Sequence, residues 1–203
     1  HGHFYQPPRE NPWTGAVERE ESASPFHDWN ERIAEECYGP ITLGAQEGSD
    51  GFTLAYDETL KRLSYDFGPT LLSWLERERP SILKRIIAAD RAAHAAIAQP
   101  YFHNILPFES RRDKETLVRW GLAEFRHRYG REAKGMWLPE TAVDNETLEV
   151  LSAEGVAFTV LDPKQAETIR SQNGVWTTMG ADHLYSKMPY LWTSPKDPTK
   201  KLA

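Results

Sequence analysis

The sequence predicts an α/β fold, in which parallel strands are joined by crossover helices and irregular loops are inserted between them. Strand-like apolar runs lie near residues 63, 101, 135 and 156, and helical stretches separate them. This alternation is typical of a parallel sheet. Three chemically interesting residues, His3, His103 and Glu140, each follow a strand-like run. Since the carboxyl ends of parallel strands share one edge, we expect these residues to converge.

The first part of the chain is punctuated by proline and glycine. Two consecutive prolines stop regular structure, and a Gly-Pro pair is a plausible end for a helix. The expected elements are, in order, a strand end over 1–8, an exposed loop over 9–25, a helix over 31–38 closed by Gly39 and Pro40, an irregular insertion over 41–56, a strand over 63–67 and a short helix over 70–77.

The second part contains the clearest helical periodicity. Apolar residues recur at near-helical spacing from Ile82 to Ile97, and Ser81 is a suitable N-cap. The expected elements are a helix over 81–98, a short strand-like segment over 101–107, a helix over 114–129, a strand near 135, a helix ending near 154, a strand over 156–161 and a less regular stretch over 168–203.

Composition limits the function classes. The chain has 203 residues, enough for one sizeable domain, and a net charge of −6 without a basic block, which argues against nucleic-acid binding. No apolar run approaches the roughly 20 residues of a membrane span. The single cysteine, Cys37, excludes an intrachain disulfide and favours a reducing, cytoplasmic compartment. Because the sequence opens at His1 without a methionine, we expect the true N-terminus to lie upstream.

The segment from Gly135 to Asp144 is the most informative for function. It places the carboxylate of Glu140 after the run Trp137-Leu138-Pro139, at the end of a predicted strand. Enzymes with (β/α) barrels keep their chemistry at this strand end. A tryptophan side chain offers a flat apolar surface on which a sugar ring can stack. Glycoside chemistry normally uses a second carboxyl group beside the first.

His1 and His3 are two residues apart, so on a strand both side chains face the same side. This spacing suits metal ligands, but no acidic pattern completes a four-ligand set. The alternative is that one histidine hydrogen-bonds within the core and the other orients a substrate hydroxyl. Gln6 can both donate to and accept from sugar hydroxyls, or it can bond the backbone of its own loop.

The other polar residues each have a structural alternative. His103 could line the site or be a buried histidine, and Asp66 could serve the same edge or cap the helix near Thr70. Asp144 is expected to be a helix N-cap. The remaining charged residues are expected to be helix-start charges (Asp113, Lys114, Glu115) or a solvated helix face (Glu146, Glu149).

Other catalytic classes find no support in the sequence. It contains no G-x-S-x-G turn, no phosphate-binding glycine loop, and no histidine placed to activate Cys37.

Three ordered blocks together resemble glycoside hydrolase family 57, most closely its amylase-related branch. The blocks are His1 to Pro8, Tyr101 to Pro107 and Gly135 to Glu140, and they span most of the chain. Members of that family act on α-glucans as amylases, glucanotransferases and branching enzymes, and some are galactosidases. The resemblance implies a (β/α)7 TIM-like barrel, a retaining mechanism, no cofactor and no metal.

Carried over position by position, Glu140 matches the catalytic nucleophile of the family, and His3 matches the first-block histidine that lines the site of cleavage. His103 matches the second-block histidine, and Trp137 the third-block aromatic residue. The family's general acid/base is an aspartate in a fourth block, which is not evident here. Asp162 is the best placed local substitute, but the simpler expectation is an aspartate beyond residue 203.

These inferences lead to one functional prediction. Residues 1–203 are expected to form the N-terminal portion of a single barrel domain, incomplete at both ends, of a retaining α-glycoside hydrolase or transglycosylase. Its predicted substrate is an α-glucan or an oligosaccharide, bound by His1, His3, Gln6, His103, Trp137 and Asp66. Two alternatives remain: a metal-dependent hydrolase or deacetylase that uses His1 and His3, and a non-catalytic carbohydrate-binding module.

Overall fold

A parallel array of short extended segments forms the centre of the molecule. The computed structural model describes residues 1–171, 173–178 and 188–203. Strand β1 (Gly2–Phe4) pairs with β4 (Tyr65–Phe67), and β5 (Gly135–Met136) pairs with β6 (Phe158–Thr159), both in parallel. Residues 96–98 lie between these pairs and bridge them in parallel, through Ala96 to Tyr65 and through Ala98 to Met136. The order in space is therefore β1, β4, 96–98, β5 and β6.

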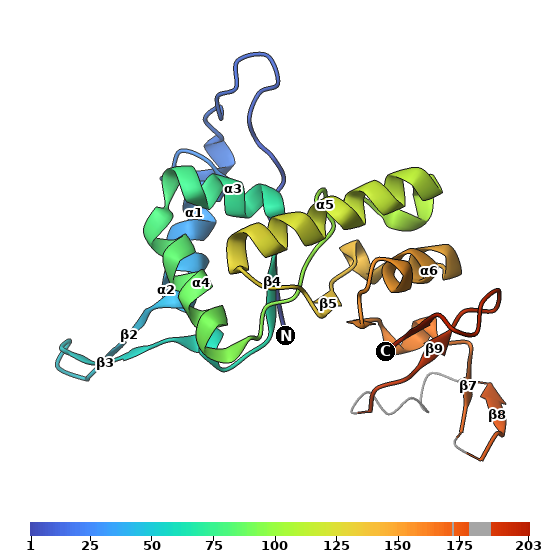
Figure 1. The fold of residues 1–203 in the computed structure, drawn as a ribbon. Helices are drawn as coiled ribbons and strands as arrows, with labels where there is room; N and C mark the ends of the chain where they lie inside the picture. Colours follow the sequence, from blue (N-terminus) through green and yellow to red (C-terminus); the bar gives the residue numbers. More distant parts are fainter. Residues whose placement is uncertain (172, 179–187) are drawn as a thin grey trace.

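Helices connect these segments in the β-α alternation that the sequence predicts, as Figure 1 shows for β4, β5 and the helices around them. The connecting helices are α3 (Pro69–Glu78), α4 (Pro80–Ala93), α5 (Arg111–Tyr129) and α6 (Asn145–Ala153). Their apolar faces pack with the strands into one core that includes Tyr65, Leu71, Ile86, Val118 and Met136. The prediction of parallel strands with crossover helices is confirmed.

The helix predicted over 81–98 is too long, and the strand predicted near 101 is misplaced. Helix α4 ends at Ala93, where His94 adopts a left-handed conformation with φ of 51°. The buried Asp90 carboxylate then accepts a hydrogen bond from the Ala96 backbone N–H at 2.9 Å. Residues 96–98 are extended, although Ala93 and Ile97 continue the helical spacing, because pairing with the neighbouring strands decides their conformation. Ser81 is not the N-cap: Arg79 holds that position, and Pro80 begins the helix.

Two further predictions in the first part need correction. Gly39 and Pro40 do not stop the helix, because α1 (Trp29–Ile33) continues through a π-helical turn (Ala34–Tyr38) into α2 (Gly39–Thr42). Such a turn accommodates a proline that cannot donate a backbone hydrogen bond. The insertion predicted as irregular forms an antiparallel hairpin of β2 (Gly44–Glu47) and β3 (Thr53–Asp57), which projects from the body (Figure 1).

The remaining elements are short. They comprise the 3-10 turns η1 (Glu21–Ala23), η3 (Thr59–Lys61), η4 (Leu106–Phe108), η5 (Pro139–Thr141) and η6 (Pro163–Gln165), and the antiparallel pairs β7 (Thr168–Arg170) with β8 (Trp176–Thr178) and β9 (Trp192–Thr193) with β10 (Lys201–Leu202). Part of the stretch predicted to be less regular, residues 172 and 179–187, lies outside the described residues. Within the part of the chain that the structure describes, no helix is long and apolar enough to cross a membrane.

Candidate active site

The carboxyl ends of the parallel segments, which we call the site edge, gather around the carboxylate of Asp66. His3 in β1 and Asp66 in β4 are register partners. His1 Nε2 lies 2.7 Å from Asp66 Oδ1, and His3 Nδ1 lies 2.7 Å from Asp66 Oδ2. Gln99, directly after the 96–98 segment, also donates to Asp66 Oδ2 and to the backbone oxygen of Phe4. Asp66 is fully buried and orients side chains from two neighbouring segments.

The hydrogen-bond pattern assigns the histidine tautomers. An ionised carboxylate only accepts hydrogen bonds, so the His3 Nδ1–H donates to Asp66 and His3 Nε2 is left as an acceptor. His103 Nε2 lies 3.2 Å from that atom and therefore donates to it. The His103 ring also stacks on Tyr5, with centroids 4.0 Å apart. Asp66, His3 and His103 thus form one chain of hydrogen bonds that runs from the core to the surface.

Burial and neighbouring charges shift two pKa values in this chain. Burial raises the pKa of the Asp66 carboxyl, and the hydrogen bond and charge of His3 oppose that shift only in part. Burial lowers the pKa of the His103 imidazole, and the neighbouring His3 lowers it further. The Glu140 carboxylate opposes these two effects and raises the pKa of the same imidazole.

Trp137 brings an aromatic surface to the same edge. Its ring stacks on the imidazole of His1 with centroids 5.2 Å apart, and on that of His3 at 4.9 Å. Its backbone N–H donates to the carbonyl oxygen of Ala98 at 2.8 Å, which fixes the start of the turn that follows β5. Among the described residues, no group accepts a hydrogen bond from its buried indole N–H.

Glu140 lies on a turn with an uncommon backbone conformation. Glu140 and Thr141 both have positive φ, 56° and 53°, although neither is glycine. Such conformations are costly and concentrate at functional sites. The backbone oxygen of Thr141 accepts a hydrogen bond from the Gln165 side chain at 2.7 Å. The Glu140 side chain is exposed, and no described residue forms a hydrogen bond or ion pair with its carboxylate.

Other predicted residues lie apart from this cluster. The side chain of Gln6 is bonded to Arg9 and to the hydroxyl of Tyr38, at 3.0 and 3.3 Å. Asp144 is the N-cap of α6, as predicted, and accepts a hydrogen bond from the Thr147 backbone N–H at 2.7 Å. Asp162 likewise caps the short η6 turn. Asp66 does not cap α3, whose N-cap is Gly68.

Sequence reasoning missed Gln99 and misjudged Lys114 and Glu149. Gln99 follows the extended 96–98 segment, which the sequence hides inside an apparent helix. Lys114 was expected to be only a helix-start charge and Glu149 part of a solvated helix face, yet they are only 1% and 4% exposed. Sequence periodicity does not predict a buried charge, because the groups that compensate for it come from other elements of the fold.

Within the described residues, the site edge offers hydrogen-bonding histidines, an aromatic face and the Glu140 carboxylate, which has no hydrogen-bond partner there. His1 Nε2 and His3 Nδ1 are both directed at Asp66, and over the described residues no group of three or more His, Cys, Asp or Glu side chains is arranged to hold a metal ion. Such a set can bind hydroxyl groups, and its free carboxylate can attack an electrophilic carbon.

Comparison with known proteins gives this geometry a family context. The sequence model described as glycosyl hydrolase family 57 matches residues 17–191. Alpha-amylase 1 of Dictyoglomus thermophilum is 25% identical over 101 residues, which are 49% of this chain and 15% of that protein.

Two solved structures extend this comparison. The structure of an exo-type maltose-forming amylase from a Pyrococcus species matches with a TM-score of 0.53 and 20% identity, over 68% of this chain and 22% of that one. A 4-alpha-glucanotransferase from Thermococcus litoralis matches with a TM-score of 0.46 and 20% identity, over 52% and 17%. The chain thus spans less than a quarter of the length of each of these proteins. Since the family model covers most of its residues, the chain belongs to glycosyl hydrolase family 57.

Proposed function

We propose that this chain contributes the nucleophilic part of the active site of a retaining α-glycoside hydrolase or transglycosylase that acts on α-glucans or their oligosaccharides. The observation that carries the proposal is the exposed Glu140 carboxylate, which has no hydrogen-bond or ion-pair partner among the described residues. It is presented on a positive-φ turn three residues after Trp137, whose ring stacks on His1 and His3. Membership of the family and the amylase and glucanotransferase names of the matched proteins support the substrate class.

In the proposed reaction, the Glu140 carboxylate attacks the anomeric carbon and forms a glycosyl ester as the glycosidic C–O bond breaks. A second carboxyl group protonates the departing oxygen. The same group then deprotonates a water molecule or an acceptor hydroxyl, whose oxygen displaces Glu140 from the sugar with net retention of configuration. Hydrolysis and transfer differ only in that acceptor.

The other residues of the site edge hold the sugar in this scheme. The sugar packs against the rings of His1, His3, His103 and Trp137, and its hydroxyls compete for the histidine nitrogens that now bond Asp66, Ser64 and each other. Asp66 fixes the tautomer and orientation of His1 and His3. Gln6 contributes through Arg9 and Tyr38 to the loop behind the site.

The second carboxyl group is proposed to come from polypeptide beyond residue 203. Asp66, Asp144 and Asp162 are already engaged, the first with two histidines and the others as caps. We propose that the parallel array described here is part of one (β/α)7 barrel, in which a later strand supplies an aspartate about 5 Å from Glu140.

The decisive experiment is replacement of the proposed nucleophile in the full-length protein. Glu140→Gln is expected to lower kcat on maltooligosaccharides by about 10³-fold or more, because the amide cannot form the glycosyl ester. A 5-fluoro-glucosyl fluoride should label the wild-type protein on the peptide that contains Glu140, as detected by mass spectrometry. Full activity of Glu140→Gln, or a label on a different residue, would disprove the assignment. Stoichiometric zinc in active, purified protein would favour the deacetylase alternative instead.

A further inference from the structure

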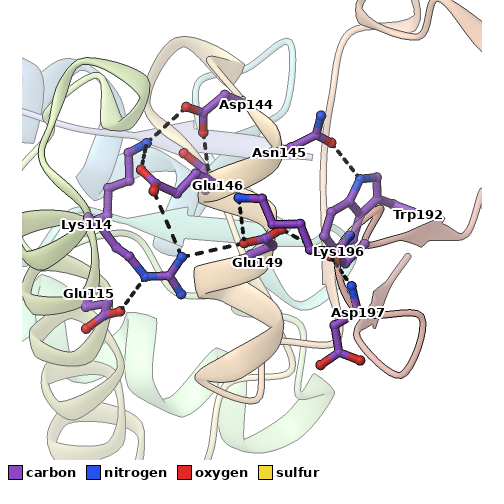
Figure 2. A network of polar contacts seen from close by, with 12 residues as sticks. Lys114, Glu115, Asp144, Asn145, Glu146, Glu149, Trp192, Lys196 and Asp197 are labelled. Atoms are coloured by element: carbon purple, nitrogen blue, oxygen red, sulfur yellow. Dashed lines mark hydrogen bonds and ion pairs between the residues drawn. The ribbon is translucent and has the colours of Figure 1, made fainter.

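A buried lysine in α5 contacts two carboxylates at the start of α6, 30 and 32 positions away in sequence. The Lys114 side chain, from the first turns of α5, is 2% exposed. Its Nζ lies 3.0 Å from Asp144 Oδ2 and 3.0 Å from Glu146 Oε2, at the beginning of α6 (Figure 2). We infer that Lys114 is a positioning residue, which holds the start of α6 and thereby the strained turn that presents Glu140. This inference builds on the proposed role of Glu140.

The position of Lys114 is unfavourable for its own helix. A positive charge in the first turns of a helix opposes the helix dipole, and a buried ammonium group loses its hydration. Two carboxylates compensate for both costs. Burial lowers the pKa of Lys114, but the hydrogen bonds and charges of Asp144 and Glu146 outweigh it and raise that pKa above its usual value. The buried ammonium group of Lys114 is therefore stabilised by its contacts with α6 and not by its own helix, α5.

The start of α6 in turn fixes one end of the Glu140 turn. Asp144 uses one carboxylate oxygen to cap the Thr147 N–H at 2.7 Å and the other to bind Lys114. Only three residues separate Asp144 from Glu140. At the other end, the Trp137 N–H is bonded to Ala98. A positive-φ conformation persists only where the surroundings hold it, and these two anchors act together with the Gln165 side chain, which donates to the Thr141 backbone oxygen at 2.7 Å.

Further contacts strengthen the anchor at the start of α6. Arg111 lies 3.5 Å from the buried Glu149, which also accepts a hydrogen bond from Ser194 at 3.1 Å. The Trp192 indole donates to Asn145 at 3.0 Å (Figure 2). The first turns of α6 are thus held by α5 on one side and by the β9 region on the other.

The test compares Lys114→Met with a matched control, Arg119→Met, in the full-length protein. Lys114→Met removes two ion pairs at the start of α6. Arg119→Met removes one ion pair, with Glu154 (2.7 Å), at the opposite end of α6. Lys114→Met is expected to lower kcat about 10- to 100-fold with little change in KM, since small displacements of a reacting group are costly. Hydrogen exchange of peptides that cover residues 138–147 should become faster. Arg119→Met should change neither kcat nor the exchange rate of these peptides.

Two outcomes would overturn the inference: unchanged kcat in Lys114→Met, or equally accelerated exchange over residues 138–147 in Arg119→Met. If Lys114→Met does not fold, Asp144→Asn provides the same readouts, because asparagine still caps a helix but lacks the charge that Lys114 needs. The hydrogen-exchange result does not depend on catalysis or on which residue is the nucleophile. An active Glu140→Gln would therefore disprove the nucleophile while leaving the anchoring by Lys114 open to its own test.

Discussion

Two carboxylates at the same edge of the sheet have opposite surroundings. Asp66 is fully buried and bonded to His1, His3 and Gln99. Glu140 is exposed, has no hydrogen-bond partner among the described residues, and lies on a backbone with φ of 56°. The difference separates two roles: a carboxylate that is fully bonded organises its neighbours, and one that is free can react. The hydrogen bonds of Asp66 connect neighbouring segments of the fold. At Glu140, contacts of the surrounding residues maintain an unfavourable backbone conformation.

The largest expected difference between the two carboxylates is in stability. Asp66→Ala leaves two histidines and Gln99 without their buried partner and should lower the free energy of unfolding by roughly 3–5 kcal/mol. Glu140→Ala removes an exposed side chain and should change it by about 0.5 kcal/mol or less. Urea denaturation of both variants measures this difference. Equal losses would contradict the division of roles.

Backbone strain at Glu140 predicts a smaller effect of the opposite sign. Glycine adopts positive φ without steric cost, so Glu140→Gly should stabilise the protein by roughly 0.5–1 kcal/mol while abolishing activity. Thr141→Gly is the matched variant, since Thr141 has the same conformation but leaves the carboxylate in place. It should be stabilising too, with part of the activity retained. If thermal unfolding shows both variants to be destabilised, the turn is not strained in the native protein.

The smallest effect concerns pH and distinguishes His103 from Asp66. The folded pKa of His103 is lowered by burial, so its contribution to stability is present above the unfolded value of about 6.5 and is lost as the pH falls through the folded value. Asp66 has a raised folded pKa, so its contribution is present at acid pH and is lost as the pH rises through that value. Wild-type protein should therefore lose stability relative to His103→Gln between pH 7 and pH 5. Parallel curves for the two proteins would contradict this assignment.

The sequence predicted the local elements near the site well, because local signals specify them. Residues 1–8 and 63–67 contain the expected strands, and the helices around residues 114–129 and 145–154 are present. Asp144 caps α6 as its position suggests. Each of these features depends on neighbours within a few residues, such as paired prolines, a capping side chain or a glycine after a helix.

The errors occurred where distant contacts override a local pattern. Residues 96–98 follow helical spacing but pair with β4 and β5. Pro40 reads as a stop, yet a π-helical turn carries the helix past it. Lys114 was predicted to be a helix-start charge and Glu149 a solvated one, although both are buried and partners from other elements compensate for their burial.

The sequence by itself determined the parallel α/β alternation, the family, and the identity of Glu140 as the residue to explain. Only the tertiary structure decided that Asp66 organises the histidines, that Gln99 joins them, that Glu140 lies on a positive-φ turn, and that a buried lysine contacts the start of the following helix. The physical reason is the distance along the sequence over which each interaction acts. Propensities and caps act over a few residues, whereas a buried charge or a positive-φ turn is stable only when side chains from distant segments hold it.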